Sequence, residues 1–196
     1  MSHRITIEQN VEILKRYAFL ERACMRTLAG WLPGVPEWDA KNQFGLHIWE
    51  SADAADHIRG RLRELRNYQP ERGLSPGLKQ VAAALDRAQN TAEVIATVYL
   101  VVKKALLHAY RNHPEVTWSD FDNPTVKVTE ALIAQTEAQV AWADGAFPAI
   151  AGRYPGWEAW QATINRLLAR DGGVMGTSPS GEPDVQLSTP TPTLPW

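Results

Sequence analysis

The sequence contains little of what several classes of protein require. A single cysteine, Cys24, excludes an internal disulfide and a cysteine-rich zinc site, and it indicates a reducing compartment. No apolar run approaches the roughly 20 residues that span a bilayer, and the N-terminus has no apolar core of a signal peptide. Positive charge is not in excess, since 20 Lys and Arg face 22 Asp and Glu, which argues against nucleic acid as the main partner. These absences predict a cytoplasmic protein that binds neither nucleic acid nor a membrane.

Strand signals are also scarce, and helical periodicity runs through nearly all of the chain. Its 196 residues fit one domain. We expect four long helices, a short extra helix before the third of them and a fifth helix at the C-terminal end, over residues 6–30, 37–67, 76–88, 91–112, 125–146 and 156–170. Capping boxes mark two of the helix starts, at Thr6 with Gln9 and at Asn90 with Glu93. The expected fold is therefore all-α, a four-helix bundle over residues 1–170.

The last 26 residues have a different composition, because 16 of residues 171–196 are Gly, Pro, Ser or Thr. Such a composition is typical of a disordered tail. Proline-rich extended segments lose little entropy on docking, however. We expect this tail to be held on the bundle through its apolar side chains, which are Leu187, Leu194, Pro195 and Trp196.

Carboxylates interrupt the apolar stripes of three predicted helices. Glu21 lies within the core stripe of the first helix, and Glu137 has Ile133 and Val140 as apolar neighbours on the fourth long helix. The second helix carries four polar residues spaced by three, three and four, which places them along one face: His47, Glu50, Asp53 and His57. Carboxylates and imidazoles on facing helices are ligands for iron or manganese. Without a metal, the same acids would be satisfied by neighbouring polar side chains.

Four segments carry a family resemblance: residues 20–24 (LERAC), 47–57 (HIWESADAADH), 122–125 (DNPT) and 136–142 (TEAQVAW). Together they resemble the ferritin-like superfamily, and in particular a little-characterised bacterial branch of it. The usual pattern of this family is a Glu on each of two helices and Glu-x-x-His on each of the other two. The resemblance matches Glu21 to the lone Glu of the first helix, His57 to the histidine of the second-helix motif and Glu137 to the Glu of the last-helix motif.

Three positions differ from the family pattern. Ala54 stands where a Glu is expected before the second-helix histidine, so Glu50 or Asp53 would supply that carboxylate. Val140 stands where the last-helix histidine is expected. The third long helix lacks the expected Glu and carries Tyr99 near that stripe. These differences leave a mononuclear site, an atypical site for two metal ions and a metal-free descendant as alternatives.

The first expected function follows from this resemblance. It is an iron-dependent oxidase or oxygenase that acts on a small organic substrate, with an aromatic compound as one candidate. One or two irons would be held by a set of four ligands: Glu21, Glu50, His57 and Glu137. Asp53 and His47 would support these ligands or replace one of them, and Tyr99 would be a nearby hydrogen-bond donor at the cofactor.

Two other functions use the same bundle without a metal. In the first, Glu50, Asp53 and His57 are catalytic acid/base residues, since a carboxylate one helical turn from a histidine can orient it and raise its pKa. In the second, the chain is a non-enzymatic binding protein whose buried acids fix the register of the bundle. The 8 Trp residues favour core packing or an aromatic pocket for a flat small molecule. A homodimer is compatible with Trp residues on the last helix.

Other polar residues have simpler expected roles. Cys24 is expected to be a buried, inert thiol on the first helix. Lys103 and Lys104 follow an apolar run and are expected to extend their ammonium groups to solvent. His113 precedes Pro114 and is expected to cap the end of the third long helix.

Overall fold

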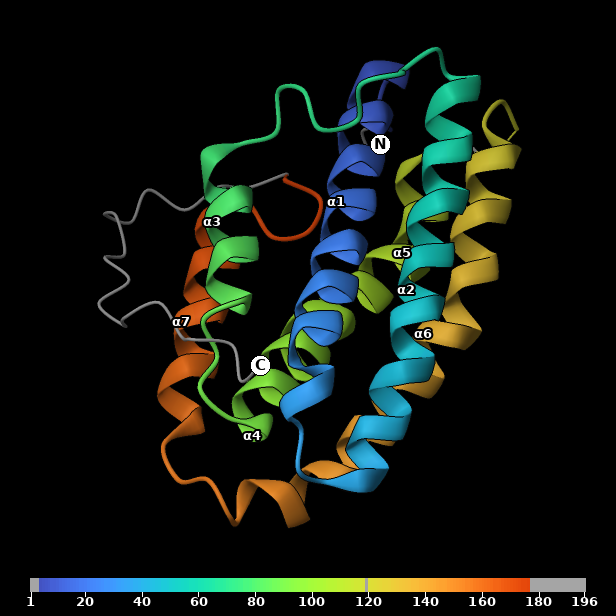
Figure 1. Ribbon diagram of the computed structural model, residues 1–196. Helices are drawn as coiled ribbons and strands as arrows, with labels where there is room; N and C mark the ends of the chain where they lie inside the picture. Colours follow the sequence, from blue (N-terminus) through green and yellow to red (C-terminus); the bar gives the residue numbers. More distant parts are fainter. Residues whose placement is uncertain (1–3, 119, 177–196) are drawn as a thin grey trace.

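The computed structural model describes residues 4–118 and 120–176 (Figure 1). Within these ranges the chain is helical and contains no strand. Three long helices and one composite rod form a four-helix bundle: α1 (Ile7–Trp31), α2 (Trp38–Glu64), α6 (Asn123–Ala151) and the rod of α4 (Thr91–Val94), η2 (Ile95–Lys103) and α5 (Lys104–Val116). A short 3-10 turn, η1 (Leu32–Gly34), joins α1 to α2. The predicted all-α bundle is confirmed at this level.

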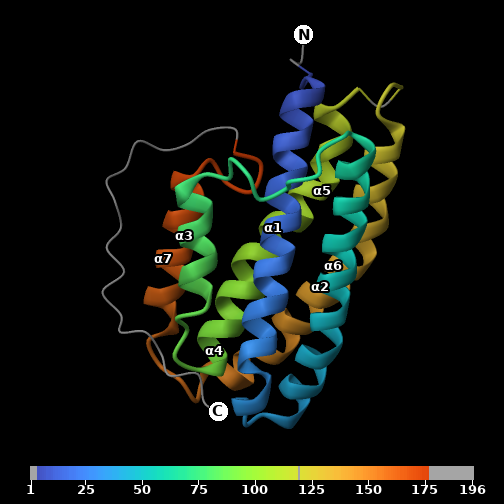
Figure 2. The same ribbon diagram turned by 45° about the horizontal axis from the view of Figure 1, so that its top comes forward.

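Two further helices cover one side of this bundle. The short extra helix α3 (Pro76–Leu85) precedes the composite rod, and α7 (Trp157–Arg170) follows α6, as the sequence predicted. They pack side by side next to α1, opposite α2 and α6 (Figures 1 and 2). At the upper end of the bundle in Figure 2, the start of α1 lies beside the end of α2, the end of α5 and the start of α6.

The predicted capping box at Thr6 is confirmed, whereas only half of the one at Asn90 forms, because the Glu93 side chain accepts from the Gln89 backbone and not from that of Asn90. The Thr6 Oγ1 atom accepts from the Gln9 backbone at 3.3 Å, and the Gln9 side chain accepts from the Thr6 backbone at 2.8 Å. The Asn90 side chain accepts from the Glu93 backbone at 2.9 Å. These bonds satisfy backbone N–H groups that the first helical turn leaves without partners, so they fix where α1 and α4 begin.

The helix ends differ more from the predicted ones. The third rod continues to Val116 through Pro114, and α6 continues to Ala151 through Pro148. A proline inside a helix removes one backbone hydrogen bond and costs about 3 kcal/mol, but neighbouring buried residues such as Phe147 hold these turns against the core. The second helix ends three residues earlier than predicted, since Arg66 adopts a left-handed conformation with φ 60°.

The central rod contains a π-helical segment, η2, where the sequence predicted a regular α-helix. A helix that is apolar on all sides is a buried helix, and η2 contacts α1, α6 and α7. Two of its polar residues, Tyr99 and Lys103, are nevertheless fully buried. Because π-helical turns frequently lie at functional sites, the partners of these two side chains matter for function.

The turn after α7 is fastened to α1. The buried Arg16 guanidinium donates to the backbone carbonyls of Asp171, Gly173 and Val174 at 2.6–3.1 Å. It also pairs with the Asp171 carboxylate at 2.8 Å, which accepts in addition from Ser75. Docking of the C-terminal segment is therefore observed for residues 171–176. The four residues predicted to hold the rest of the tail lie outside the described residues. Of the helices described, none has the length and apolar character needed to cross a membrane.

Candidate functional site

The four predicted iron ligands do not come together in the structure. Glu21 is fully buried, whereas His57 and Glu137 have 63% and 45% of their side-chain surface exposed. Glu50 is half-buried between α2 and α6. Across residues 4–118 and 120–176 no three His, Cys, Asp or Glu side chains are grouped so that they could hold a metal ion.

Glu21 lies in the core as predicted, but its partners are a lysine and a tyrosine. The Lys103 ammonium is 2.5 Å from Glu21 Oε2, and the Tyr110 hydroxyl donates to Glu21 Oε1 at 2.9 Å. Both carboxylate oxygens are therefore occupied. Burial, together with the Glu21 charge, raises the pKa of Tyr110 well above its usual value, so the hydroxyl remains a donor. We call Lys103 and Glu21 the central pair.

The prediction that Lys103 reaches solvent is wrong. Its side chain is only 1% exposed, whereas that of the neighbouring Lys104 is 45% exposed and pairs with Asp144. The sequence could not separate two adjacent lysines, because the π-helical segment changes which side of the rod faces α1. The sequence did contain one signal for a buried lysine. Glu21 was predicted to lie in the core, and a buried carboxylate requires a positively charged partner.

The other predicted site residues have partners of their own near the surface. Glu137 is 2.5 Å from Arg111, and His57 is 3.3 Å from Asp53. Glu50 accepts from the Gln139 side chain at 2.7 Å. The structure thus brings together only Asp53 and His57 of the proposed acid/base cluster, at an exposed position on α2.

His47 and Tyr99 do meet, inside the bundle. The His47 Nδ1 atom is 2.8 Å from the Tyr99 hydroxyl, and the Trp142 ring packs edge-on against both side chains. Burial and, to a smaller extent, the positive charge of Lys103 together lower the pKa of His47 to about 4. His47 is therefore neutral at pH 7. Cys24 is fully buried, and burial raises its pKa to about 12, which confirms the predicted inert thiol.

These contacts test whether the predicted ligands fit iron. A metal ion at Glu21 would have to displace the Lys103 ammonium or share the carboxylate with it, and two cations at one buried carboxylate repel each other. His57 and Glu137 are directed to other partners at the surface. The donor set in this arrangement does not fit an iron centre.

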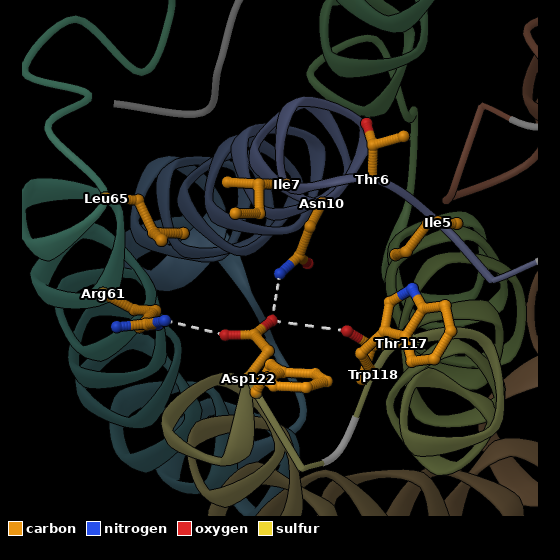
Figure 3. Close-up of a pocket in the computed structure, with 10 residues that line it drawn as sticks. Ile5, Thr6, Ile7, Asn10, Arg61, Leu65, Thr117, Trp118 and Asp122 are labelled. Carbon is orange, nitrogen blue, oxygen red and sulfur yellow. Dashed lines mark hydrogen bonds and ion pairs between the residues drawn. The ribbon is translucent and has the colours of Figure 1, made fainter.

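A cavity of about 390 Å³ lies instead at the end of the bundle, where α1 begins, α2 ends and α5 is joined to α6 (Figures 2 and 3). We call it the end pocket. Five of its lining residues are apolar: Ile5, Ile7, Leu65, Trp118 and Phe121. The other five are polar: Thr6, Asn10, Arg61, Thr117 and Asp122.

Asp122, just before α6, is the centre of the polar wall. Its Oδ1 atom accepts from Arg61 at 2.7 Å and from Thr125 at 2.6 Å. Its Oδ2 atom accepts from the Asn10 amide and from Thr117 (Figure 3). Since four donors surround this carboxylate, Asp122 joins α1, α2, α5 and α6 at this end of the bundle.

Arg61 is engaged just as fully. Its guanidinium donates to Thr125 at 2.9 Å, to Glu64 at 2.7 Å and to Asp122 at 2.7 Å. Burial opposes the charge on Arg61, but the hydrogen bonds that Arg61 donates to the Glu64 and Asp122 carboxylates, together with their negative charges, outweigh burial and raise the pKa of Arg61. The two charges of the pocket wall therefore neutralise each other.

Two buried polar atoms near this wall have no partner among the described residues. They are Asn10 Oδ1, on a residue that is 3% exposed, and His113 Nε2. The predicted capping role of the His113 side chain is wrong, because the ring is buried and its Nδ1 atom is 3.3 Å from the Tyr17 hydroxyl. Burial lowers the pKa of His113 to about 4, although the charge of Asp122 acts in the opposite direction. His113 is therefore neutral at pH 7.

The mouth of the end pocket is apolar and exposed. Ile7, Trp118 and Phe121 have 68%, 49% and 84% of their surface exposed. The Arg4 guanidinium lies over the Trp118 ring, 4.7 Å from its centroid. Large exposed apolar side chains around a cavity are typical of a binding site. The sequence predicted an aromatic pocket for a flat small molecule as one alternative, but no local pattern pointed to this end of the bundle.

Comparison with protein-family models, with curated proteins and with solved structures found no match for this chain.

Proposed function

We propose that this chain is a binding protein for a small, largely apolar molecule, and that the molecule lies in the end pocket. The observation that carries this proposal is the cavity itself, about 390 Å³ in volume with five apolar side chains in its wall. Ligand sites are typically cavities of roughly 300–1,000 Å³ that combine apolar walls with a few polar groups. Of the three functions considered from the sequence, this is the non-enzymatic one.

The polar wall favours binding over catalysis. The lining residues of the described chain include no His, Cys, Lys or Glu. The Asp122 carboxylate accepts four hydrogen bonds, so it has little capacity left to act as a base or a nucleophile. Arg61 is held by three acceptors. The part of the pocket that remains available to a ligand is therefore its apolar surface, next to a polar wall whose charged groups already have partners.

The iron-dependent oxidase stays a prediction from the ferritin-like resemblance, as does the ferritin-like assignment of the bundle. Iron at the predicted position requires Glu21 to exchange Lys103 for a metal and requires His57 and Glu137 to turn inward. The metal-free acid/base enzyme requires Glu50 to join Asp53 and His57, from which its bond to Gln139 holds it apart. The end pocket requires no such rearrangement.

The test uses N-phenyl-1-naphthylamine, a neutral dye that fluoresces more strongly in apolar surroundings. Leu65→Trp fills the cavity from the end of α2, where the Leu65 side chain points into it (Figure 3). Leu46→Trp is the matched control, because Leu46 lies on the same helix but is 49% exposed and does not line the pocket. We expect the wild type and Leu46→Trp to bind the dye and Leu65→Trp to bind it at least roughly tenfold more weakly.

Two results would contradict the proposal. One is a wild-type chain that does not enhance the fluorescence of the dye. The other is a Leu65→Trp variant that binds as well as the Leu46→Trp control. Far-ultraviolet circular dichroism of both variants, compared with the wild type, shows whether the helices are retained.

A further inference from the structure

The four-helix bundle is covered on one side and open on the other. Helices α3 and α7 pack next to α1, whereas the outward sides of α2 and α6 are exposed to solvent (Figures 1 and 2). The exposed side of α2 carries Trp38, Leu46 and Trp49, with 71%, 49% and 63% of their surface accessible. Large apolar side chains gathered on one exposed face are typical of a contact with another molecule.

These three residues share one face of α2. Trp38 and Trp49 are 11 positions apart, which is close to three helical turns, and Leu46 precedes Trp49 by three positions. The sequence allowed a homodimer through Trp residues of the last helix, but Trp157 and Trp160 pack partly against the core. The tryptophans most available for a contact are therefore those of α2.

The neighbouring helix α6 exposes small side chains instead of large ones. Six of them, spaced by three and four positions, form a row along its outward side: Ala131, Ala134, Ala138, Ala141, Gly145 and Ala149. The distance between packed helices depends on the side chains at the contact, so such a row allows another helix to approach closely. The large side chains on α2 beside this row are what give it significance.

A contact between the two helices shows which positions lie level with each other. Helices α2 and α6 run antiparallel (Figure 1), and Glu50 on α2 accepts a hydrogen bond from Gln139 on α6. Trp49 is therefore level with about Ala138. Trp38, three turns earlier on α2, is level with the C-terminal end of the row of small residues on α6.

From this arrangement we propose that the outward side of α2 and α6, which we call the α2–α6 face, binds a second copy of this chain. The two copies are related by a twofold axis that runs parallel to the helices between the two faces. Rotation about this axis places α2 of one copy over α6 of the other at an unchanged level. Trp49 then meets Ala138 of the second copy, and Trp38 meets the C-terminal end of its row. Since each large side chain meets a small one, the face is complementary to itself.

The size of the α2–α6 face fits a dimer interface. From Ala131 to Ala149 it is about 27 Å long, and two adjacent helices make it about 20 Å wide, so its projected area is about 540 Å². The exposed parts of Trp38 and Trp49 add roughly 300 Å². A stable interface covers about 800 Å² of each partner.

The centre of the face also carries little charge. On α2, residues 42–49 include no Asp, Glu, Lys or Arg, and His47 among them is buried. On α6, residues 131–142 include one charged residue, Glu137, which pairs with Arg111 on α5. Charged side chains gather towards one end of the face: Asp53, Asp56, Lys127 and Glu130. An aromatic centre with few charges and a polar border is typical of a protein–protein interface.

Sedimentation equilibrium of the full chain tests the proposal. We expect the wild type to form a dimer with a dissociation constant of about 10 μM or lower. Trp49→Asp replaces an anchor by a charge in both copies, so the dimer should dissociate at least roughly hundredfold more readily. Tyr68→Asp is the matched control, because Tyr68 is 73% exposed and follows α2 outside the face. It should leave the dimer unchanged.

An exchange of a large and a small residue tests which helices meet. Ala138→Trp sets two tryptophans against each other and should weaken the dimer roughly tenfold or more. The double variant Trp49→Ala, Ala138→Trp again pairs one large side chain with one small one, so it should recover most of the affinity. All three substituted positions are exposed, so the far-ultraviolet circular dichroism of each variant should match that of the wild type.

Three results would overturn the proposal. A wild type that remains monomeric up to about 100 μM excludes the dimer. A dimer that Trp49→Asp leaves intact, or that Tyr68→Asp weakens equally, excludes this face. A double variant that dimerises no better than Ala138→Trp excludes the placement of α2 over α6. None of the substituted positions lines the end pocket, so every variant should bind N-phenyl-1-naphthylamine like the wild type, and the proposed function is tested separately.

Discussion

Of the buried ion pairs in the described residues, one lies at the middle of the bundle and another at its end. In the central pair, Lys103 and Glu21 are 1% and 0% exposed, and the remaining carboxylate oxygen is taken by Tyr110. In the end pair, Arg61 and Asp122 are 11% and 14% exposed and form one wall of a cavity. The same type of contact therefore closes the core in one place and shapes a site in the other. Of these two pairs, the end pair is the one that lines the cavity.

The largest expected effect comes from breaking the central pair. Lys103→Met leaves the Glu21 carboxylate buried without a cation, and we expect the free energy of unfolding to fall by about 3–5 kcal/mol. Lys104→Met is the matched control, because its partner Asp144 and its own side chain are half exposed, and we expect a change of at most about 1 kcal/mol. Urea denaturation measures both.

The double variant Glu21→Gln, Lys103→Met keeps this prediction testable if the single variant does not fold. Removing both charges should recover most of the lost stability, since no buried charge is left without a partner. Equal losses from Lys103→Met and Lys104→Met would contradict the assignment of Lys103 to the core.

Acid should weaken both regions through a buried histidine near each. The pKa values of His47 and His113 are lowered to about 4 by burial, from an ordinary value of about 6.5. Between pH 6.5 and 4 the unfolded chain therefore binds protons that the folded chain does not, and stability falls with pH by up to about 3 kcal/mol for each histidine.

The measurement is the free energy of unfolding in urea from pH 7 to pH 4.5. His47→Gln and His113→Gln should each reduce the slope of stability against pH. A slope that neither variant changes would show that other groups cause the acid sensitivity.

Breaking the end pair should cost less stability but should affect binding. Asp122→Asn keeps the shape of the side chain and removes the charge that holds Arg61, and we expect a loss of about 2 kcal/mol. Binding of N-phenyl-1-naphthylamine should weaken, because the polar wall loses its balance of charge. Asp120→Asn, two residues away and exposed, should change neither quantity. A destabilised Asp122→Asn with unchanged dye binding would separate this pair from the pocket.

The smallest effects are expected at the predicted iron ligands on the surface. Glu137→Gln and His57→Gln remove exposed contacts to Arg111 and Asp53, so stability should change by less than about 0.5 kcal/mol. In an anaerobic Fe(II) titration the two variants should behave like the wild type. Iron bound by the wild type and lost in both variants would instead support the ferritin-like oxidase.

Local signals in the sequence were sufficient for the helices and for their starts. Thr6 and Asn90 fix two starts through side-chain bonds to backbone within three residues, which a sequence shows directly. The ends of α5 and α6 could not be read locally, because packing from distant residues holds the chain helical through Pro114 and Pro148.

The candidate site depended on contacts that no local pattern contains. Arg61 and Asp122 are 61 residues apart, and Asn10 and Asp122 are 112 residues apart. Glu21 was correctly predicted to lie in the core, but its partner Lys103 was not. The two residues are 82 positions apart in the sequence, and Lys103 ends a π-helical segment whose register the sequence does not reveal. The exposed positions of His57 and Glu137 reflect the same uncertainty of register by one or two residues.

The π-helical segment η2 also bears on how this chain can vary. Each π-type hydrogen bond spans one more residue than an α-helical one, so a residue gained or lost between Ile95 and Lys103 can be absorbed by a change of helical type. A gain or loss that was not absorbed in this way would rotate everything after it by about 100° relative to what precedes it. A chain that absorbs the change within η2 would instead keep Tyr110, which lies after it, in place against Glu21.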